Sequence, residues 1–360
     1  MFIINLVEMS APMSDLEPIA MDRTQLRHLE DAREMWERYE FFLTRQEKFR
    51  GAMGWKKVGA HEYLTTYFTN PLTGKKQMGS LGRRSSETEK KKADFDLGRA
   101  EVDKAAAKIK QELEPLIRVG RALRIGRLEP IASDVLRELA RHELFDAKLF
   151  VIGSAAMHLF EASAGALLPR TLFAEGDLDL LSSAESRQEA MEELLPVIQR
   201  ADKSFTLHAA SRSMRNDRGF RVHLHTRRSL LKSIDQLDGA SEEQLSVLHS
   251  LLDLEPVSAV AIARDGALVG MTGMDPRAFA LTKYALATLD PDRDGAATRM
   301  AKDQAYAVGR LVVRFGARPF EEDHLAAFPA FAESIETGDP EVAGVIGAAS
   351  ATPAPLMKRA

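Results

Sequence analysis

Asp177 and Asp179 are the pair of residues in this sequence whose type and spacing are best suited to chemistry. Segment 177–181 reads Asp-Leu-Asp-Leu-Leu, and this alternation predicts a strand with both carboxylates on one face. Two carboxylates held side by side repel each other. A divalent cation that prefers hard oxygen ligands removes the repulsion, so the pair predicts a site for Mg²⁺ or Mn²⁺.

A glycine–serine pair, Gly153 and Ser154, lies upstream of the carboxylates. The apolar segment 148–152 predicts a short buried strand before it, and residues 155–161 have a helical pattern after it. Glycine permits close approach to the backbone, and a helix N-terminus offers free N–H groups and a positive dipole end. The pair therefore indicates a phosphate cradle with a serine hydroxyl. The alternative is a plain strand-to-helix turn in which Ser154 is the N-cap.

Gly153-Ser154 followed by Asp177-x-Asp179 resembles the signature of the polymerase-β-like nucleotidyltransferase superfamily. The resemblance implies transfer of a nucleoside monophosphate from an NTP to a hydroxyl acceptor, which can be RNA, a protein or a small molecule. It also implies that Asp177 and Asp179 hold the metal. A third acidic residue is expected on segment 220–224, where His223 stands instead. Either His223 serves as the base, or Asp303 compensates, or the protein is a catalytically degenerate nucleotide-binding or interaction module.

A second resemblance begins in the N-terminal half and extends well beyond it. Tyr63-Leu64 and segment 81–89, Leu-Gly-Arg-Arg-Ser-Ser-Glu-Thr-Glu, resemble a bacterial family of nucleotidyltransferase-like proteins, over about residues 60–315. Arg83 and Arg84 in this segment are candidate contacts for an acceptor or for phosphate, as is the lysine run 90–92. The alternative for these residues is a solvated helix face.

Lys283, Arg299 and the pair Lys302-Asp303 resemble elements of abortive-infection and toxin-type nucleotidyltransferases. The resemblance implies that Lys283 binds the triphosphate, that Arg299 and Lys302 lie in the nucleotide-binding region, and that Asp303 orients or deprotonates the acceptor. A toxin–antitoxin role follows by analogy alone. Two plainer alternatives stay open: Lys283 extends from an apolar helix stripe to solvent, and Arg299 with Asp303 forms a helix ion pair.

Two further motifs carry less weight. His223 and His225 share one strand face and His208 can lie opposite them, but the sequence shows no fixed third ligand for a zinc site. Segment 73–75, Thr-Gly-Lys, lacks the preceding glycine of a P-loop, which excludes a Walker A motif.

The helical and strand patterns predict an α+β fold, with a small mixed β-sheet nucleotidyltransferase core flanked by helical N-terminal and C-terminal parts. Helices are expected at about 23–50, 87–117, 130–145, 276–289, 295–314 and 320–335, and a hairpin around Asp265-Gly266. The expected organisation is a ragged terminus (1–22), a helical N-terminal region (23–146), the nucleotidyltransferase core (147–273), a C-terminal helical region (274–336) and a disordered tail (337–360).

The composition limits the classes of protein to which the chain can belong. The chain has 360 residues and a formal net charge of −4, which is not the overall charge of a general nucleic-acid binder. It has no cysteine, which excludes disulfides and thiolate ligands, and we expect a reducing, cytoplasmic location. No apolar run approaches the ~20 residues of a membrane span, so no membrane partner is expected. The oligomeric state is left open.

Overall fold

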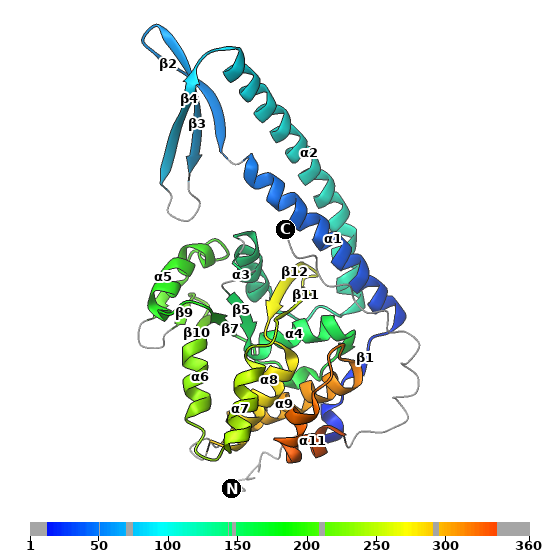
Figure 1. The fold of residues 1–360 in the computed structure, drawn as a ribbon. Coiled ribbons are helices and arrows are strands. Elements are labelled where there is room, and N and C mark those ends of the chain that lie inside the picture. The colour runs from blue at the N-terminus through cyan, green and yellow to red at the C-terminus, as the bar shows by residue number, and fades with distance from the viewer. Residues whose placement is uncertain are drawn as a thin grey trace, which may run out of the picture.

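The computed structural model describes residues 13–49, 51–69, 75–142, 144–145, 149–208, 213–290 and 295–336. Figure 1 shows two parts: a core of sheet and helices, and an arm of two long helices and a small sheet that projects from it. Helices and several sheets are both present, which confirms the α+β fold class. The start of the expected ragged terminus, residues 1–12, and the expected disordered tail, residues 337–360, lie outside the described residues.

A mixed seven-stranded sheet organises the described part of the core. Its strands are Leu149–Ile152 (β5), Asp177–Ser182 (β7), Thr206–His208 (β8), Ser213–Arg215 (β9), Arg221–Thr226 (β10), Val257–Ile262 (β11) and Leu268–Gly273 (β12). They lie in the order β11-β12-β5-β7-β10-β9-β8. β7 pairs antiparallel with β5 and parallel with β10, so it runs through the middle of the sheet.

Helices from several parts of the chain share one hydrophobic core with this sheet. The helices are Pro130–Arg141 (α3), Gly153–Ala164 (α4), Arg187–Ile198 (α5), Arg227–Asp235 (α6), Glu242–Leu251 (α7), Pro276–Thr288 (α8), Ala296–Phe315 (α9), Glu322–Ala326 (α10) and Pro329–Glu336 (α11), with the short 3-10 helix Arg170–Leu172 (η2). Leu136 of α3, Phe160 of α4 and Phe331 of α11 are buried in the same cluster. Thus α3, which the sequence pattern groups with the N-terminal region, packs with the core.

The sequence pattern predicts the C-terminal helices α8, α9 and α11 but not α6 and α7. Each missed helix begins with a capping box, formed by Thr226 with Ser229 and by Ser241 with Gln244. Ile234 is the only buried residue of α6, so little of this short helix belongs to the core. Along the described residues, no helix combines the length and the apolar character needed to cross a bilayer.

The N-terminal arm (residues 23–123) is not wholly helical, so the expectation of a helical region over 23–146 is wrong there. Along the chain, helix α1 (Arg23–Lys48) is followed by strands β2 (Ala52–Val58), β3 (His61–Thr69) and β4 (Lys76–Arg83) and then by helix α2 (Ser86–Leu123). The three strands form an antiparallel sheet. Segment 61–69 is rich in threonine and aromatic residues, which favour strands. The pairing of three separate segments stabilises them as strands, and local periodicity does not show such pairing. Ser85 is the N-cap of α2 and forms a capping box with Thr88.

Trp36 of α1 holds the base of the arm against the core sheet. A Cβ on Gly270 of β12 would lie 2.3 Å from Trp36 Nε1, so the indole fills space that any other residue at position 270 would occupy. Ala32, Ile262 and Leu268 are buried in the same cluster. The first helix is thereby fixed to the β11–β12 hairpin.

Residues 13–22 are ordered parts of the fold, which corrects the expectation of a ragged terminus over 1–22. The segment forms a 3-10 helix, Met13–Leu16 (η1), and a strand, Ile19–Ala20 (β1), which pairs with Ala166–Leu167 (β6). Leu16 is fully buried in the main core cluster. Glu17 accepts a hydrogen bond of 2.5 Å from the buried Arg310. These contacts involve residues about 150 to about 300 positions away, so the local sequence does not reveal them.

We expect Leu16→Ala to lower the free energy of unfolding by roughly 2–5 kcal/mol, because it removes a fully buried side chain from the core. Ile19→Ala is the matched control, since Ile19 is 69% exposed and should change stability by no more than about 0.5 kcal/mol. Urea denaturation of the full chain measures both. Equal effects of the two variants would show that residues 13–22 do not contribute to the core.

Candidate functional site

Asp177 and Asp179 project from one face of β7, as the sequence pattern predicts. Along β7, half-buried and fully buried residues alternate, and both carboxylates belong to the half-buried set. β10 runs parallel beside it in a register that pairs Arg221 with Asp177 and His223 with Asp179. Arg221 lies 3.9 Å from the Asp177 carboxylate in an exposed ion pair. The site is therefore the common face of two neighbouring parallel strands.

Gly153 lies directly against the carboxylate of Asp179. Ile152, the last residue of β5, is paired with Asp179, and the chain turns at Gly153 with a φ of +64°. A Cβ at this position would lie 2.2 Å from Asp179 Oδ2. Only glycine combines this left-handed conformation with the absence of a side chain. The glycine predicted from the sequence is thus required by a contact with the predicted carboxylate.

The start of α4 is free of a side-chain cap. The N-cap residue is Ile152, which forms no side-chain capping bond, so the alternative in which Ser154 is the N-cap is wrong. Ser154 is instead buried in the first turn of the helix. The first-turn N–H groups and the positive end of the helix dipole lie next to the Asp179 carboxylate. This arrangement can hold a phosphate group or orient a carboxylate.

Lys283 of α8 reaches the same site. Burial lowers the pKa of Lys283 to about 8, although the negative charges of Asp179 and Asp177 act in the opposite direction. Its Nζ donates a hydrogen bond to Gln304 Oε1, and it lies 5.2 Å from the ring centroid of Phe279. The structure therefore does not support the alternative of a lysine that extends to solvent. Lys283 is the C-terminal candidate that the fold brings to the carboxylates.

The carboxyl of Asp177 is partly buried and lies near a second carboxylate. Burial, followed by the charge of Asp179, raises the pKa of Asp177 above its usual range. His223 and Arg221 lower it, and Glu129 raises it further. A group with an altered pKa on a polar face of a buried sheet is a candidate for function. Burial and the neighbouring carboxylate together disfavour the charged form of Asp177.

Glu129 is a residue of the site that the sequence pattern does not indicate. Its Oε2 accepts a hydrogen bond of 3.1 Å from the backbone N–H of Gly176, the residue before Asp177. Glu129 is the N-cap residue of α3 and precedes Pro130. A Glu-Pro pair is an ordinary helix-start signal, so the sequence gives no reason to place it beside a carboxylate 48 positions later.

The histidines do not form a zinc site. His225 Nε2 lies 3.3 Å from Asp179 Oδ1, and His223 is beside Asp179 on the neighbouring strand. His208 pairs with Ser213 and Ser213 pairs with His223, so His208 is two strands away from His223, roughly 10 Å. No group of three or more His, Asp or Glu residues suited to a metal ion occurs within the described ranges.

The remaining candidates lie on two other elements. Arg299, Lys302 and Asp303 are on the first two turns of α9, and Asp303 directly precedes the Gln304 that binds Lys283. The Lys302 ammonium lies 5.8 Å from the ring centroid of Tyr306. Arg83 and Arg84 are on the arm, at the end of β4, away from the core sheet. The structure therefore groups the Gly-Ser turn, the two carboxylates and Lys283, and leaves the arm arginines in a separate region.

A strand-borne acid pair beside an uncapped helix start and a buried amine forms a site of the kind that phosphoryl-transfer proteins use, because it presents partners for both phosphate oxygens and cations. A family model described as Nucleotidyltransferase matches residues 131–328, which is more than half of the chain. The chain belongs to this nucleotidyltransferase family. No match was found among curated proteins or among solved structures. The predicted likeness to a bacterial subfamily and to toxin-type members stays a prediction.

We expect Gly153→Ala to lower the free energy of unfolding because it adds a Cβ against Asp179 as well as backbone strain. Gly59→Ala is the matched control: its φ is +60°, and a Cβ there has no neighbour within 4 Å. The control should lose roughly 1–2 kcal/mol from backbone strain, and Gly153→Ala should lose roughly 1–3 kcal/mol more. Chemical denaturation measures both. Equal losses would contradict a tight contact between Gly153 and Asp179.

Proposed function

We propose that the protein transfers a nucleoside monophosphate from an NTP to a hydroxyl acceptor, with Mg²⁺ or Mn²⁺ bound by Asp177 and Asp179. The observation that carries the proposal is the carboxylate pair of β7, with Asp179 against Gly153 at the start of α4 and the buried Lys283 within electrostatic reach of both carboxylates. The family membership supports nucleotidyl transfer in general. The acceptor, which can be RNA, a protein or a small molecule, and the metal are parts of the proposal.

The residues of the site fit a hard divalent cation. Carboxylate oxygens are the ligands that Mg²⁺ prefers, and burial, followed by the charge of Asp179, raises the pKa of Asp177, so a bound cation would stabilise its charged form. The space beside Asp179 Oδ2 is kept free by the missing side chain of Gly153. When bound, the ion supplies charge neutralisation at the phosphate groups. Its other ligands would be phosphate oxygens and water, since β7 offers two carboxylates.

The start of α4 and Lys283 are the proposed phosphate contacts. First-turn N–H groups at Gly153 and Ser154 donate to phosphate oxygens, and the Lys283 ammonium provides a positive charge. Gln304, which accepts a hydrogen bond from Lys283 and donates one of 2.5 Å to the carbonyl of Leu172, fixes the lysine in place. Arg299 and Lys302 are proposed as further nucleotide contacts because they lie on the same helix as Gln304.

A histidine is the proposed base for the acceptor hydroxyl. His223 stands in register with Asp179, where the resemblance predicts a third acid, and His225 is bonded to Asp179. Histidine as a residue type exchanges protons near neutral pH, so it can accept the proton of the hydroxyl. Asp303 is the alternative, because it neighbours Gln304 on α9. If neither group acts, the protein is a nucleotide-binding module without turnover.

Label transfer from an α-labelled NTP to cellular RNA or lysate tests the proposal. We expect Asp177→Asn and Asp179→Asn each to reduce transfer at least about 100-fold, because each removes a charge that holds the metal and the transferring group. Asp238→Asn, which changes an exposed carboxylate on the loop after α6, is the control and should retain transfer. Undiminished transfer in both site variants would refute the proposal. NTP binding without transfer in the wild type would favour the degenerate module.

The affinity for NTP should weaken as pH rises through about 8, because Lys283 loses its proton there and a neutral amine no longer attracts phosphate. The sign follows from the lowered pKa: the amine is charged below about pH 8 and neutral above it. Titration calorimetry with a non-hydrolysable NTP between about pH 7 and about pH 9.5 should show a severalfold loss of affinity.

Lys283→Met is the control for this pH dependence. It should bind NTP more weakly than wild type at about pH 7 and show no further loss at higher pH, because it carries no titrating amine. The same pH dependence in the wild type and in Lys283→Met would show that another group is responsible, and that Lys283 does not contact the phosphates.

A further inference from the structure

The sheet of the N-terminal arm has one face that is turned away from its own helices. We define this outer face by Lys56, Tyr63, Tyr67, Lys76, Met78 and Arg83. Cross-strand pairing puts these residues together, because Lys56 is opposite Tyr63, Tyr63 is opposite Arg83, and Tyr67 is opposite Met78. Residues that are directly opposite each other in antiparallel strands point to the same side. Lys56 Nζ lies 3.8 Å from Met78 Sδ, which confirms the shared side.

The opposite, inner face of the sheet is the one that contacts α2. Arg84, which leads into α2, lies 5.0 Å from the ring centroid of Trp55 and 2.7 Å from the Glu62 carboxylate. Trp55 and Glu62 belong to the inner face, together with the fully buried Leu64. Arg84 therefore has a structural role within the arm. On the outer face, Tyr67 and Met78 are 40% and 59% exposed, whereas Thr65 in the middle of this face is buried.

The outer face is positively charged although the whole chain has a net charge of −4. Its charged side chains are Lys56, Lys76 and Arg83, and none of the strand residues on this side is an aspartate or a glutamate. The acidic residue of the sheet, Glu62, is on the inner face. A surface with several cations and no anion attracts a polyanion.

The outer face combines these cations with aromatic rings and hydroxyl groups. Tyr63 and Tyr67 offer faces on which bases can stack, and lysine and arginine between them can contact phosphates. Thr69 and Ser80 are exposed on the same side and can bond a ribose 2′-hydroxyl. We propose that the outer face binds single-stranded RNA. The inference rests on the proposed function where it makes this RNA the acceptor, whereas RNA binding itself does not depend on it.

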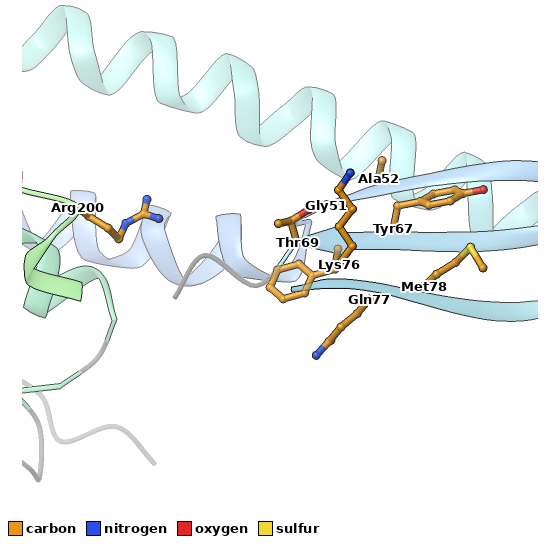
Figure 2. Close-up of a pocket in the computed structure, with 9 residues that line it drawn as sticks. Gly51, Ala52, Tyr67, Thr69, Lys76, Gln77, Met78 and Arg200 are labelled. Atoms are coloured by element: carbon orange, nitrogen blue, oxygen red, sulfur yellow. The ribbon is translucent and has the colours of Figure 1, made fainter. Parts of the chain in front are cut away.

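The end of the arm sheet meets the core at a cleft. Thr69 and Lys76, with their neighbours on β3 and β4, line a cleft of about 710 Å³ whose other wall includes Arg200, at the end of α5 (Figure 2). In Figure 1 this end of the sheet points toward α5. The cleft therefore places Arg200 of the core, which is ion-paired with Glu138, opposite Lys76 of the outer face.

Fluorescence anisotropy with a labelled single-stranded RNA of about 12 nucleotides, using the full chain, tests the inference. We expect Lys76→Glu/Arg83→Glu to weaken binding at least about tenfold, because it reverses two charges, and Tyr67→Ala to weaken it at least about fivefold by loss of stacking. The matched control is Lys57→Glu/Lys104→Glu, which makes the same charge change on the inner face and on α2 and should bind within about twofold of wild type.

Each other outcome overturns the assignment. Equal losses in the test and control variants would show that net charge, and not the outer face, sets the affinity. Equal affinity for single-stranded DNA or duplex RNA would exclude specific use of single-stranded RNA. If the wild type binds no RNA, the assignment is wrong, and a protein partner becomes the candidate ligand of the outer face. The variant Asp177→Asn/Asp179→Asn separates the two proposals, because it should bind RNA normally even if nucleotidyl transfer is never observed.

Discussion

The contact between the Asp179 carboxylate and the backbone of Gly153 is the constraint on which the site depends. The register of β5 with β7 places Ile152 opposite Asp179, so the chain must turn into α4 directly above the carboxylate. A Cβ on Gly153 would lie 2.2 Å from Asp179 Oδ2, and the φ of +64° is one that glycine adopts without strain. One contact thereby fixes a carboxylate and a helix N-terminus relative to each other, and Asp177 follows on the same strand face.

Charge balance explains why the C-terminal helices belong to the site. Asp177 and Asp179 favour the charged form of Lys283, whereas burial disfavours it more strongly, which leaves its pKa at about 8. The amine is held by Gln304 of α9, whose side chain also binds the carbonyl of Leu172. A lysine held in this way loses little conformational entropy when it meets a phosphate. Helices α8 and α9 therefore set the electrostatics of the sheet that they cover.

The positively charged outer face of the arm also results from strand pairing. Lys56, Lys76 and Arg83 are far apart in the sequence, and only the registers of β2, β3 and β4 place them on one side. The bulge between Leu64 and Thr65 adjusts this register near the end of β4. Trp36 anchors the arm to Gly270 of the core, so the sheet is presented at a defined position beside α5.

The sequence by itself determined the local parts of this protein: the Asp-x-Asp strand, the Gly-Ser turn, the long helices and the β11–β12 hairpin around Asp265-Gly266. These follow from side-chain period and turn chemistry, which act over a few residues. Only the tertiary structure decided that Leu16 and Glu17 belong to the core, that Glu129 approaches Asp177, that Ser154 is not an N-cap, and that segment 52–83 is a sheet. Each depends on a partner distant in sequence, and local propensity carries no information about which distant segment a residue will meet.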